Sequence, residues 1–299
     1  MHRRQFIQHS ALAAAMLAFY KSDVFANTNL ARAYQFKALR NDVGIFMEQG
    51  GTIGWLNGSS GFVVVDSQFP ASAPHVIDEL KKLDEKPFKY LLNTHHHGDH
   101  TAGNISFKGL TEHVVAHQNS LINQKLAAEK AKNEDKQLFP DITFGKGWKA
   151  PVGKEKISGY YYGSGHTNGD VVYHFENANI AHVGDLVFNR RYPYIDKDNG
   201  AHIGNWITAL DKIQKQFDND TLFICGHALD PEKVVINKSD IKAYQNYLES
   251  LLTFVKAEMK AGKTKEEILK ATAIPGAPEW QGDGIVRSLT AAYQELTVG

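Results

Sequence analysis

The sequence predicts an α/β protein in which strands pack in the interior and helices cover the outside. Short apolar runs with glycine-rich turns alternate with segments of helical spacing through most of the 299 residues. The composition is typical of a folded globular chain, since 42% of the residues are hydrophobic and 22% are charged. A formal net charge of +0 gives no attraction to a polyanion, so nucleic acid is not an expected partner. A single cysteine, Cys225, excludes an intramolecular disulfide and is interpreted as a small buried residue.

Residues 1–26 are predicted to be an export signal rather than part of the fold. Arg3 and Arg4 form a twin pair, an apolar run follows over residues 11–20, and the segment ends on Val-Phe-Ala. The run is shorter than the roughly 20 residues that a bilayer-spanning helix needs. We therefore expect a periplasmic protein exported by the twin-arginine route, with no membrane anchor after cleavage and one domain over residues 27–299. An uncleaved anchor and a plain amphipathic helix are the alternatives.

The first half of that domain alternates strands with helices. Apolar runs and glycine-rich turns over residues 43–65 predict two or three short strands in a meander. Residues 74–83 have helical spacing, and residues 88–93 form a short apolar strand that leads into a histidine cluster. A strand over residues 112–116 and a helix over residues 119–137 follow.

The second half contains further strands and a helical C-terminal extension over residues 231–299. In that extension, Asp240 is predicted to cap a helix that ends near Gly262, and Thr264 with Glu267 forms a capping box for the next helix. The broad apolar stripe of the first of these helices is interpreted as core. Upstream of the extension, the predicted strands cover residues 157–162, 170–175, 180–183 and 222–225, with a helix over residues 206–217 capped by Asn205.

A histidine-rich segment, THHHGDH over residues 94–100, carries the strongest chemical signal. Side chains of an extended segment alternate between its two sides, so His95 and His97 point one way and the histidine between them the other way. Two imidazoles on one side predict a metal site. After the glycine turn, Asp99 and His100 are placed to reach a second metal beside it. Imidazole and carboxylate ligands together suit zinc, whereas a surface polar cluster is the alternative interpretation.

Three further ligand candidates lie downstream, each directly after a glycine. His166 lies between two predicted strands, in the segment GSGHTNGD. Asp185 and His227 each follow the end of a predicted strand. A preceding glycine lets the backbone turn and approach a site closely. Any one of these residues alone would more often be an ordinary loop residue.

Taken together, these motifs resemble those of the metallo-β-lactamase superfamily over about residues 40–230. HxHxDH, GHTxGD, a strand-borne GD and a late GH occur in that family's order. The resemblance implies a four-layer αββα sandwich with the metals at one edge of its two sheets, followed by the helical tail. It also implies two zinc ions per chain, with iron or manganese as alternatives. By that match His95, His97 and His166 hold the first metal, Asp99, His100 and His227 hold the second, and Asp185 bridges both.

Asp185 narrows the expected function. Two groups of true β-lactamases typically carry Cys at this position and a third usually carries Ser, whereas Asp resembles glyoxalase II-like thioesterases, lactonases and phosphodiesterases. We therefore expect a dinuclear zinc hydrolase that attacks a carbonyl of a small ester, thioester, lactone or lactam with a metal-bridging hydroxide. A true periplasmic β-lactamase is the first alternative. An iron-dependent oxidoreductase, a nuclease on the same fold and a non-enzymatic metal-binding scaffold are weaker alternatives.

Other residues near the motifs are candidates for catalysis and substrate binding. Asp99 is the expected catalytic residue, because a carboxylate beside the nucleophile can orient it and relay its proton. Arg190 and Arg191 are candidates to bind a substrate carboxylate, and Trp55 to form an apolar wall, although structural roles are equally open for the arginines and burial is favoured for Trp55. The expected partner is a small-molecule substrate, and the oligomeric state stays open. Three residues are candidates to orient the imidazoles: Asn93, Thr94 and Asp170.

Overall fold

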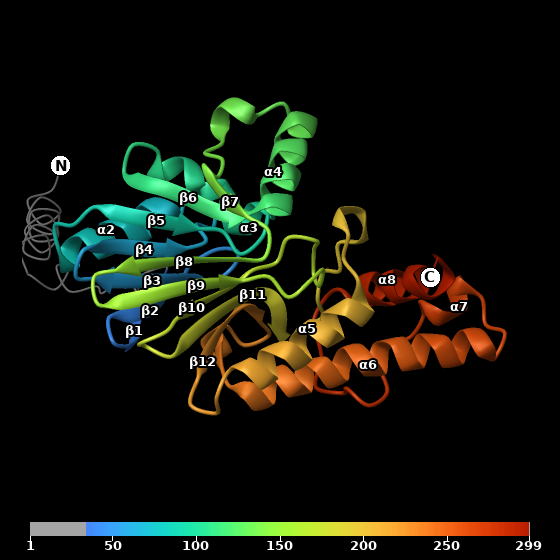
Figure 1. Cartoon of the computed structure of the whole chain (residues 1–299). Helices are drawn as coiled ribbons and strands as arrows, with labels where there is room; N and C mark the ends of the chain where they lie inside the picture. The colour runs from blue at the N-terminus through green and yellow to red at the C-terminus, as the bar shows by residue number, and fades with distance from the viewer. Residues whose placement is uncertain (1–33, 299) are drawn as a thin grey trace, which may run out of the picture. The chain divides into compact units, whose positions relative to one another are not determined.

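Two β-sheets face each other in this computed structural model, which describes residues 34–298 (Figure 1). The predicted export signal lies outside the described residues. The first sheet has its seven strands in chain order, with antiparallel pairing from β2 to β4 and parallel pairing from β4 to β7. These strands are β1 (Gln35–Arg40), β2 (Val43–Met47), β3 (Ile53–Gly58), β4 (Gly61–Val65), β5 (Phe88–Leu92), β6 (Thr111–His117) and β7 (Ile142–Phe144).

The second sheet has six strands in the order β13-β12-β11-β10-β9-β8. Its neighbours pair antiparallel, except that β11 and β12 run parallel. Every residue of β11 is buried, as expected for a central strand that is covered on both faces. The strands are β8 (Gly147–Val152), β9 (Glu155–Tyr160), β10 (Val172–Phe175), β11 (Ile180–Asn189), β12 (Leu222–Ala228) and β13 (Val235–Ile236).

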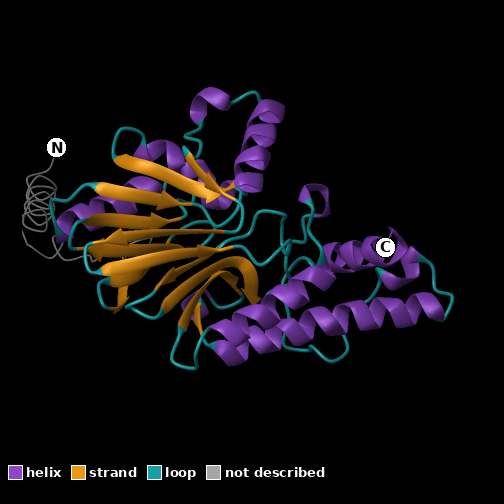
Figure 2. Ribbon diagram, viewed as in Figure 1, coloured by secondary structure: helices purple, strands orange, loops and turns teal. Residues whose placement is uncertain are grey.

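Helices cover the outer faces of the two sheets (Figure 2). Helix α4 packs on β6, α6 packs on β11 and α5, and α8 packs on α6. The predicted αββα sandwich with a helical C-terminal tail is therefore confirmed. Between residues 34 and 298, no helix is long and apolar enough to cross a membrane. The α-helices are α2 (Ala73–Leu83), α3 (Gly98–Thr101), α4 (Gln118–Ala131), α5 (Ile203–Gln216), α6 (Lys238–Lys260), α7 (Lys265–Ile268) and α8 (Ile285–Val298).

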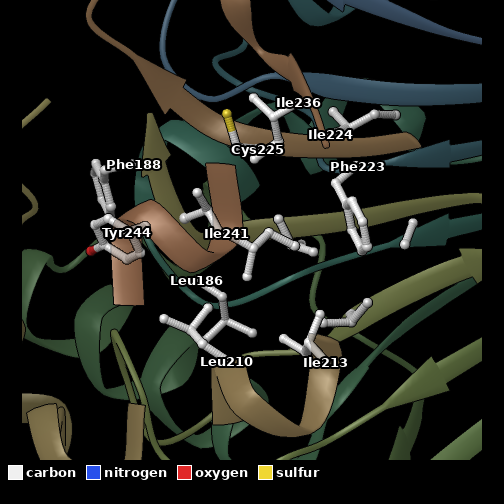
Figure 3. Packing of buried hydrophobic residues seen from close by; sticks show 14 of the residues in the cluster. Leu186, Phe188, Leu210, Ile213, Phe223, Ile224, Cys225, Ile236, Ile241 and Tyr244 are labelled. Atoms are coloured by element: carbon white, nitrogen blue, oxygen red, sulfur yellow. The ribbon is translucent and has the colours of Figure 1, made fainter. Parts of the chain in front are cut away.

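The C-terminal helices share the hydrophobic core with the second sheet. Figure 3 shows Leu210 of α5 and Ile241 of α6 gathered with Leu186 of β11 and Ile236 of β13. Trp280, in the connection before α8, is buried in the same cluster. Burying apolar surface of this extent is the main stabilising contribution to a fold, so the helices that follow residue 231 complete this core.

Several predicted bounds and caps differ from the structure. Strands β11 and β12 continue past their predicted ends, so Asp185 and His227 lie within strands rather than after them. Helix α5 begins at Ile203 and is capped by His202, whose ring accepts the amide N–H of Asn205. Helix α6 is capped by Asn237. Asp240, at the third position of the helix, is the second partner of the same capping box.

Other predictions of local structure are confirmed. The meander over residues 43–65 forms β2, β3 and β4, and the capping box of Thr264 and Glu267 begins α7. Helix α4 ends at Ala131, six residues before its predicted end, where Lys132 takes a left-handed conformation. Strands β1, β7, β8 and β13 and helix α8 were not predicted, and Gly98, where a tight turn was predicted, is the first residue of the short helix α3.

Candidate metal centre

The predicted ligands meet near one edge of both sheets, from segments that follow strands and from within β11 and β12. Residues 95–100 follow β5, and His166 lies in the connection between β9 and β10. Asp185 comes from β11 and His227 from β12. All seven predicted ligands therefore converge on one region, in two groups that share Asp185.

The first group contains three imidazoles, and one nitrogen of each ring faces the other rings. We call these the inner nitrogens and the second nitrogen of each ring the outer nitrogen. His97 Nδ1 lies 3.1 Å from His95 Nε2 and 2.9 Å from His166 Nε2. Asp185 Oδ2 lies 3.4 Å from His166 Nε2 and 3.8 Å from His95 Nε2. This is the set expected around the first metal, and the alternation that pairs His95 with His97 is present.

The second group contains Asp99, His100 and His227. His227 Nε2 lies 3.1 Å from Asp99 Oδ2 and 3.4 Å from His100 Nε2. Asp185 also borders this group, with Oδ1 3.1 Å from His100 Nε2 and Oδ2 3.5 Å from His227 Nε2. Asp185 therefore occupies the position between the two groups that a bridging carboxylate requires.

Two glycines allow this convergence. Gly184 has a φ of +52°, in the left-handed region that favours glycine, and the pairing of β11 with β12 shifts register there. A Cβ atom on Gly226 would collide with Oδ1 of Asp185. The glycine before each of these strand-borne ligands thus serves a distinct purpose, a turn at Gly184 and close approach at Gly226.

Two buried carboxylates fix the orientation of histidines in both groups. Asp66, which follows β4, lies 2.7 Å from Nδ1 of His100. Asp196 lies 2.8 Å from Nε2 of His97. A carboxylate that accepts the outer N–H of an imidazole leaves the opposite nitrogen with a bare lone pair, which is the form that binds a metal.

In the other two histidines of the first group, the outer ring nitrogen also acts as a hydrogen-bond donor. His166 Nδ1 lies 2.7 Å from the backbone carbonyl oxygen of Tyr194, which can only accept, so this nitrogen carries the hydrogen. The hydroxyl of Thr94 donates to Asp66 and therefore accepts the N–H of His95 Nδ1, 3.0 Å away. All three outer nitrogens are occupied as donors.

In neutral rings, the form that binds a metal, the inner nitrogens of the first group are three lone pairs about 3 Å apart. Burial lowers the pKa of His95 far below its ordinary value and that of His166 to about 3, so both rings are neutral. Lone pairs that face one another at this distance repel unless a cation lies between them. Around a tetrahedral Zn²⁺ with bonds of about 2.0–2.1 Å, neighbouring nitrogens are roughly 3.3 Å apart, so the residues fit such an ion.

The acidic residues of the centre are ionised. Burial opposes ionisation of Asp99, but His100 and His227 hold its pKa at about 2. Burial likewise opposes ionisation of Asp185, and His227 and His100 hold its pKa well below the usual range. Oδ1 of Asp185 is buried and forms no hydrogen bond, since Nε2 of His100 lies close but outside hydrogen-bond geometry. An ionised, orphaned carboxylate oxygen is a further feature that a bound cation satisfies.

The sequence identified only one of the residues that orient these ligands. Thr94 contacts His95, as predicted, whereas Asn93 bonds to Asn104 instead. Asp170 accepts both the amide and the hydroxyl of Thr167, so it stabilises a turn. Asp66, Asp196 and the carbonyl of Tyr194 were missed. The position of Asp66 directly after an apolar strand was the available signal.

A hollow of about 170 Å³ opens beside the second group. Its lining includes the apolar residues Ala228, Pro231 and Val234, the polar residues Glu48, Thr52 and Gln68, and also His227 and Arg191. Arg191 is exposed, and no acidic side chain among residues 34–298 forms an ion pair with it. The hollow thus has mixed polar and apolar walls, with Arg191 as its cationic residue and Glu48, which is paired with His75, as its acidic one.

The other two predicted substrate contacts have structural surroundings. Arg190 hydrogen bonds to Asp240 of α6 at 3.4 Å, and its guanidinium lies 5.0 Å from the ring centre of Trp280. Trp55 is only 2% exposed and stacks on Phe36, so it belongs to the core and forms no wall of the site. The favoured interpretation of Trp55 as a buried residue is therefore confirmed, its alternative role as an apolar wall is not, and of the two arginines only Arg191 lines the hollow.

Comparison with known proteins identifies the family. A model of the metallo-β-lactamase superfamily matches residues 48–227, more than half of the chain, and the chain belongs to this superfamily. It is 27% identical over 179 residues to a metallo-β-lactamase type 2 of Bacillus cereus, which covers 58% of this chain and 64% of that protein. It is 32% identical over 164 residues to a hydroxyacylglutathione hydrolase of Pelagibacter ubique, covering 53% and 59%. The chain thus matches just under two thirds of the length of these relatives.

Solved structures share the fold. A metallo-β-lactamase from Pontibacter korlensis aligns with a TM-score of 0.61 at 19% identity, over 72% of this chain and 99% of that one. The sec-alkylsulfatase Pisa1 from Pseudomonas sp. aligns with a TM-score of 0.69 at 13% identity, over 87% of this chain and 49% of that one. The alkylsulfatase therefore aligns with more of this chain than the lactamase does.

Proposed function

We propose that this chain is a dinuclear zinc hydrolase of small esters, thioesters or lactones. The observation that carries the proposal is the pair of converging ligand groups with Asp185 between them. Neutral imidazoles and ionised carboxylates are the forms that bind Zn²⁺, and Fe²⁺ or Mn²⁺ would also accept this set. The names of the curated relatives, which include two kinds of hydrolase, support the reaction class.

The protein's own residues prepare the site in two ways. Two bound metal ions would supply an activated water and polarise the carbonyl of a substrate. Asp99 presents Oδ2 toward His227 while its side chain is 31% exposed, so it is within reach of solvent and can accept and pass on a proton. Asp66 and Asp196 accept the outer N–H groups of His100 and His97, which orients the opposite nitrogens of both rings toward a metal.

Arg191 indicates the kind of substrate. The Arg191 guanidinium has no carboxylate partner among residues 34–298, whereas Glu48, the acidic residue of the same hollow, is paired with His75. A cationic group of this kind beside His227 suits a substrate that carries its own carboxylate. The hollow is small, so the group that enters it has only a few heavy atoms. We therefore propose small carboxylate-bearing carbonyl compounds as substrates.

β-Lactams are the second candidate substrate class. They carry a carboxylate and a strained carbonyl, and three of the curated relatives are named metallo-β-lactamases. The aspartate at position 185 favours the thioester and lactone classes instead, since an aspartate at this position resembles the glyoxalase II-like branch of the superfamily.

Hydrolysis assays with and without a chelator test the proposal. The protein loaded with zinc would be given nitrocefin, an acyl thioester and a lactone, and we expect chelator-sensitive kcat/KM of about 10⁴ M⁻¹s⁻¹ or more on one of them. His95→Ala and Asp185→Ala should each abolish that activity, while His113→Ala, an exposed histidine paired with Asp141, should retain it. Hydrolysis that survives the chelator and both ligand variants would refute a metal-dependent reaction.

A further inference from the structure

A carboxylate from the C-terminal extension holds both ends of a loop next to the metal centre. Glu295 lies on α8, and its side chain is 11% exposed. Oε2 accepts from the amide of Ile203 at 2.7 Å and lies 3.0 Å from Lys197 Nζ, while Oε1 accepts from the amide of Gly204 at 2.9 Å. Lys197 begins the loop and Ile203 begins α5, so one side chain fixes the two ends of the segment over residues 196–204.

Burial and hydrogen bonding act in opposite directions on this carboxylate. Burial raises the pKa of Glu295, but the two amides and Lys197 outweigh it and leave the pKa below its usual value. The ionised carboxylate also faces the N-terminus of α5, where the helix dipole favours a negative charge. The anchor is therefore charged, multiply bonded and largely shielded from water.

The anchored segment contacts two histidines of the first ligand group. Asp196 binds Nε2 of His97, and its own amide donates to the carbonyl of His166 at 3.2 Å. At the other end of the segment, the amide of His202 donates to the carbonyl of Gly165, the residue before His166, at 3.1 Å. The segment has no long regular element of its own, so its conformation depends on these bonds and on Glu295.

We propose that Glu295 is a positioning residue for the first metal group and acts through the segment over residues 196–204. Without this anchor the segment gains conformational freedom, and Asp196 no longer holds His97 in one orientation. The inference rests on the proposed metal centre but not on the identity of the substrate. It gives the C-terminal extension, which follows the part of the chain that matches the family model, a part in metal binding.

Zinc affinity of Glu295→Gln tests this role. Competition with a chromophoric chelator should show at least one of the two zinc ions bound roughly tenfold more weakly than in the wild type, the lower end for changes around metal ligands. Glu155→Gln is the matched control, because Glu155 is also buried and accepts three backbone amides, from Lys156, Asn177 and Ala178, at the start of β9. Urea unfolding of the metal-free proteins would measure the stability that each variant loses.

The outcomes separate positioning from simple stabilisation. We expect both variants to lose stability and only Glu295→Gln to lose zinc affinity. Equal zinc affinity in Glu295→Gln and the wild type, or an equal loss in Glu155→Gln, would overturn the positioning role. If Glu295→Gln does not fold, Lys197→Ala, which removes one anchor, should weaken zinc binding by a smaller factor, and an unchanged affinity there would also overturn it. A wild-type protein that binds no zinc would refute the metal centre itself, and the positioning role with it.

Discussion

Arg190 and Arg191 are adjacent in sequence but have different surroundings. Arg190 takes a left-handed φ of +60° and is held by Asp240 and the ring of Trp280. Arg191 pairs with Gln281 through its backbone, and its side chain lines the hollow beside His227. The positive φ at Arg190 turns the chain, so consecutive side chains point to different neighbours.

This difference predicts that the same substitution affects substrate binding at Arg191 and stability at Arg190. Arg191→Gln should raise KM for a carboxylate-bearing substrate about tenfold or more and leave kcat nearly unchanged, because one charge-assisted contact is worth roughly 1.5–3 kcal/mol. Arg190→Gln is the control and should instead lower the free energy of unfolding. Steady-state kinetics and urea unfolding measure the two effects. A larger change in KM for Arg190→Gln than for Arg191→Gln would mean that Arg190, and not Arg191, contacts the substrate.

At the level of single residues, the predicted ligands converge in the structure, whereas most of the groups that orient them were not predicted. The histidine cluster over residues 94–100 is contiguous, and glycines mark Asp185 and His227. Asp196 orients His97 although 99 positions separate them, and the support of His166 is a backbone carbonyl that any residue provides. Such contacts arise from tertiary packing, which leaves no local pattern in the sequence.

Among the elements, α4 has an unusual cap. The ring of His117 accepts the amide of Asn119 at Nδ1, while Nε2 lies 2.9 Å from the carbonyl oxygen of Gly145. These contacts require a neutral ring with its hydrogen on Nε2. Burial lowers the pKa of His117 and outweighs the bond to Gly145, which raises it. Protonation of Nδ1 would therefore remove the helix cap.

This cap predicts a pH dependence of stability. Because the folded-state pKa of His117 is depressed, its contribution is complete above the ordinary histidine pKa of about 6.5 and is lost as the pH falls. An N-cap is worth about 1 kcal/mol. His117→Asn should cap α4 without titrating, so the metal-free variant should lose about 1 kcal/mol less stability than the wild type between pH 7.5 and pH 5.5. Urea unfolding at both pH values measures this difference. An equal loss of stability in the variant and the wild type would contradict the role of the cap.

Elements were predicted well where their pattern was strong. Strand β4 is a continuous apolar run of five residues, and α2 keeps its helical spacing over 11 residues. Strand β7 has three residues and β13 has two, too few for a period to be visible. Predicted ends were less accurate, because β11 continues through the bulge at Gly184, where tertiary contacts override the local tendency of glycine to end a strand.

For the whole molecule, the twin-arginine signal remains a proposal with a direct test. Arg3→Lys with Arg4→Lys should leave the uncleaved protein in the cytoplasm, because the route depends on the arginine pair. Lys21→Gln, which changes a charge outside the pair, should be exported as the wild type is. Cell fractionation followed by mass measurement of the N-terminus decides the matter. Equal export of the double variant would point to a different route.

The wide spacing of the ligands along the chain has a consequence for folding kinetics. His100, which follows a strand of the first sheet, and His227 of the second sheet meet only after the two sheets have come together, so loop closure must precede metal capture. Metal bound late should slow unfolding and leave the refolding rate nearly unchanged. At free zinc 1,000 times its Kd, about 4 kcal/mol of stability would therefore appear as an unfolding rate roughly a thousandfold slower, which stopped-flow mixing with and without a chelator would measure. The metal would therefore bind after the fold has formed and stabilise it mainly by slowing unfolding.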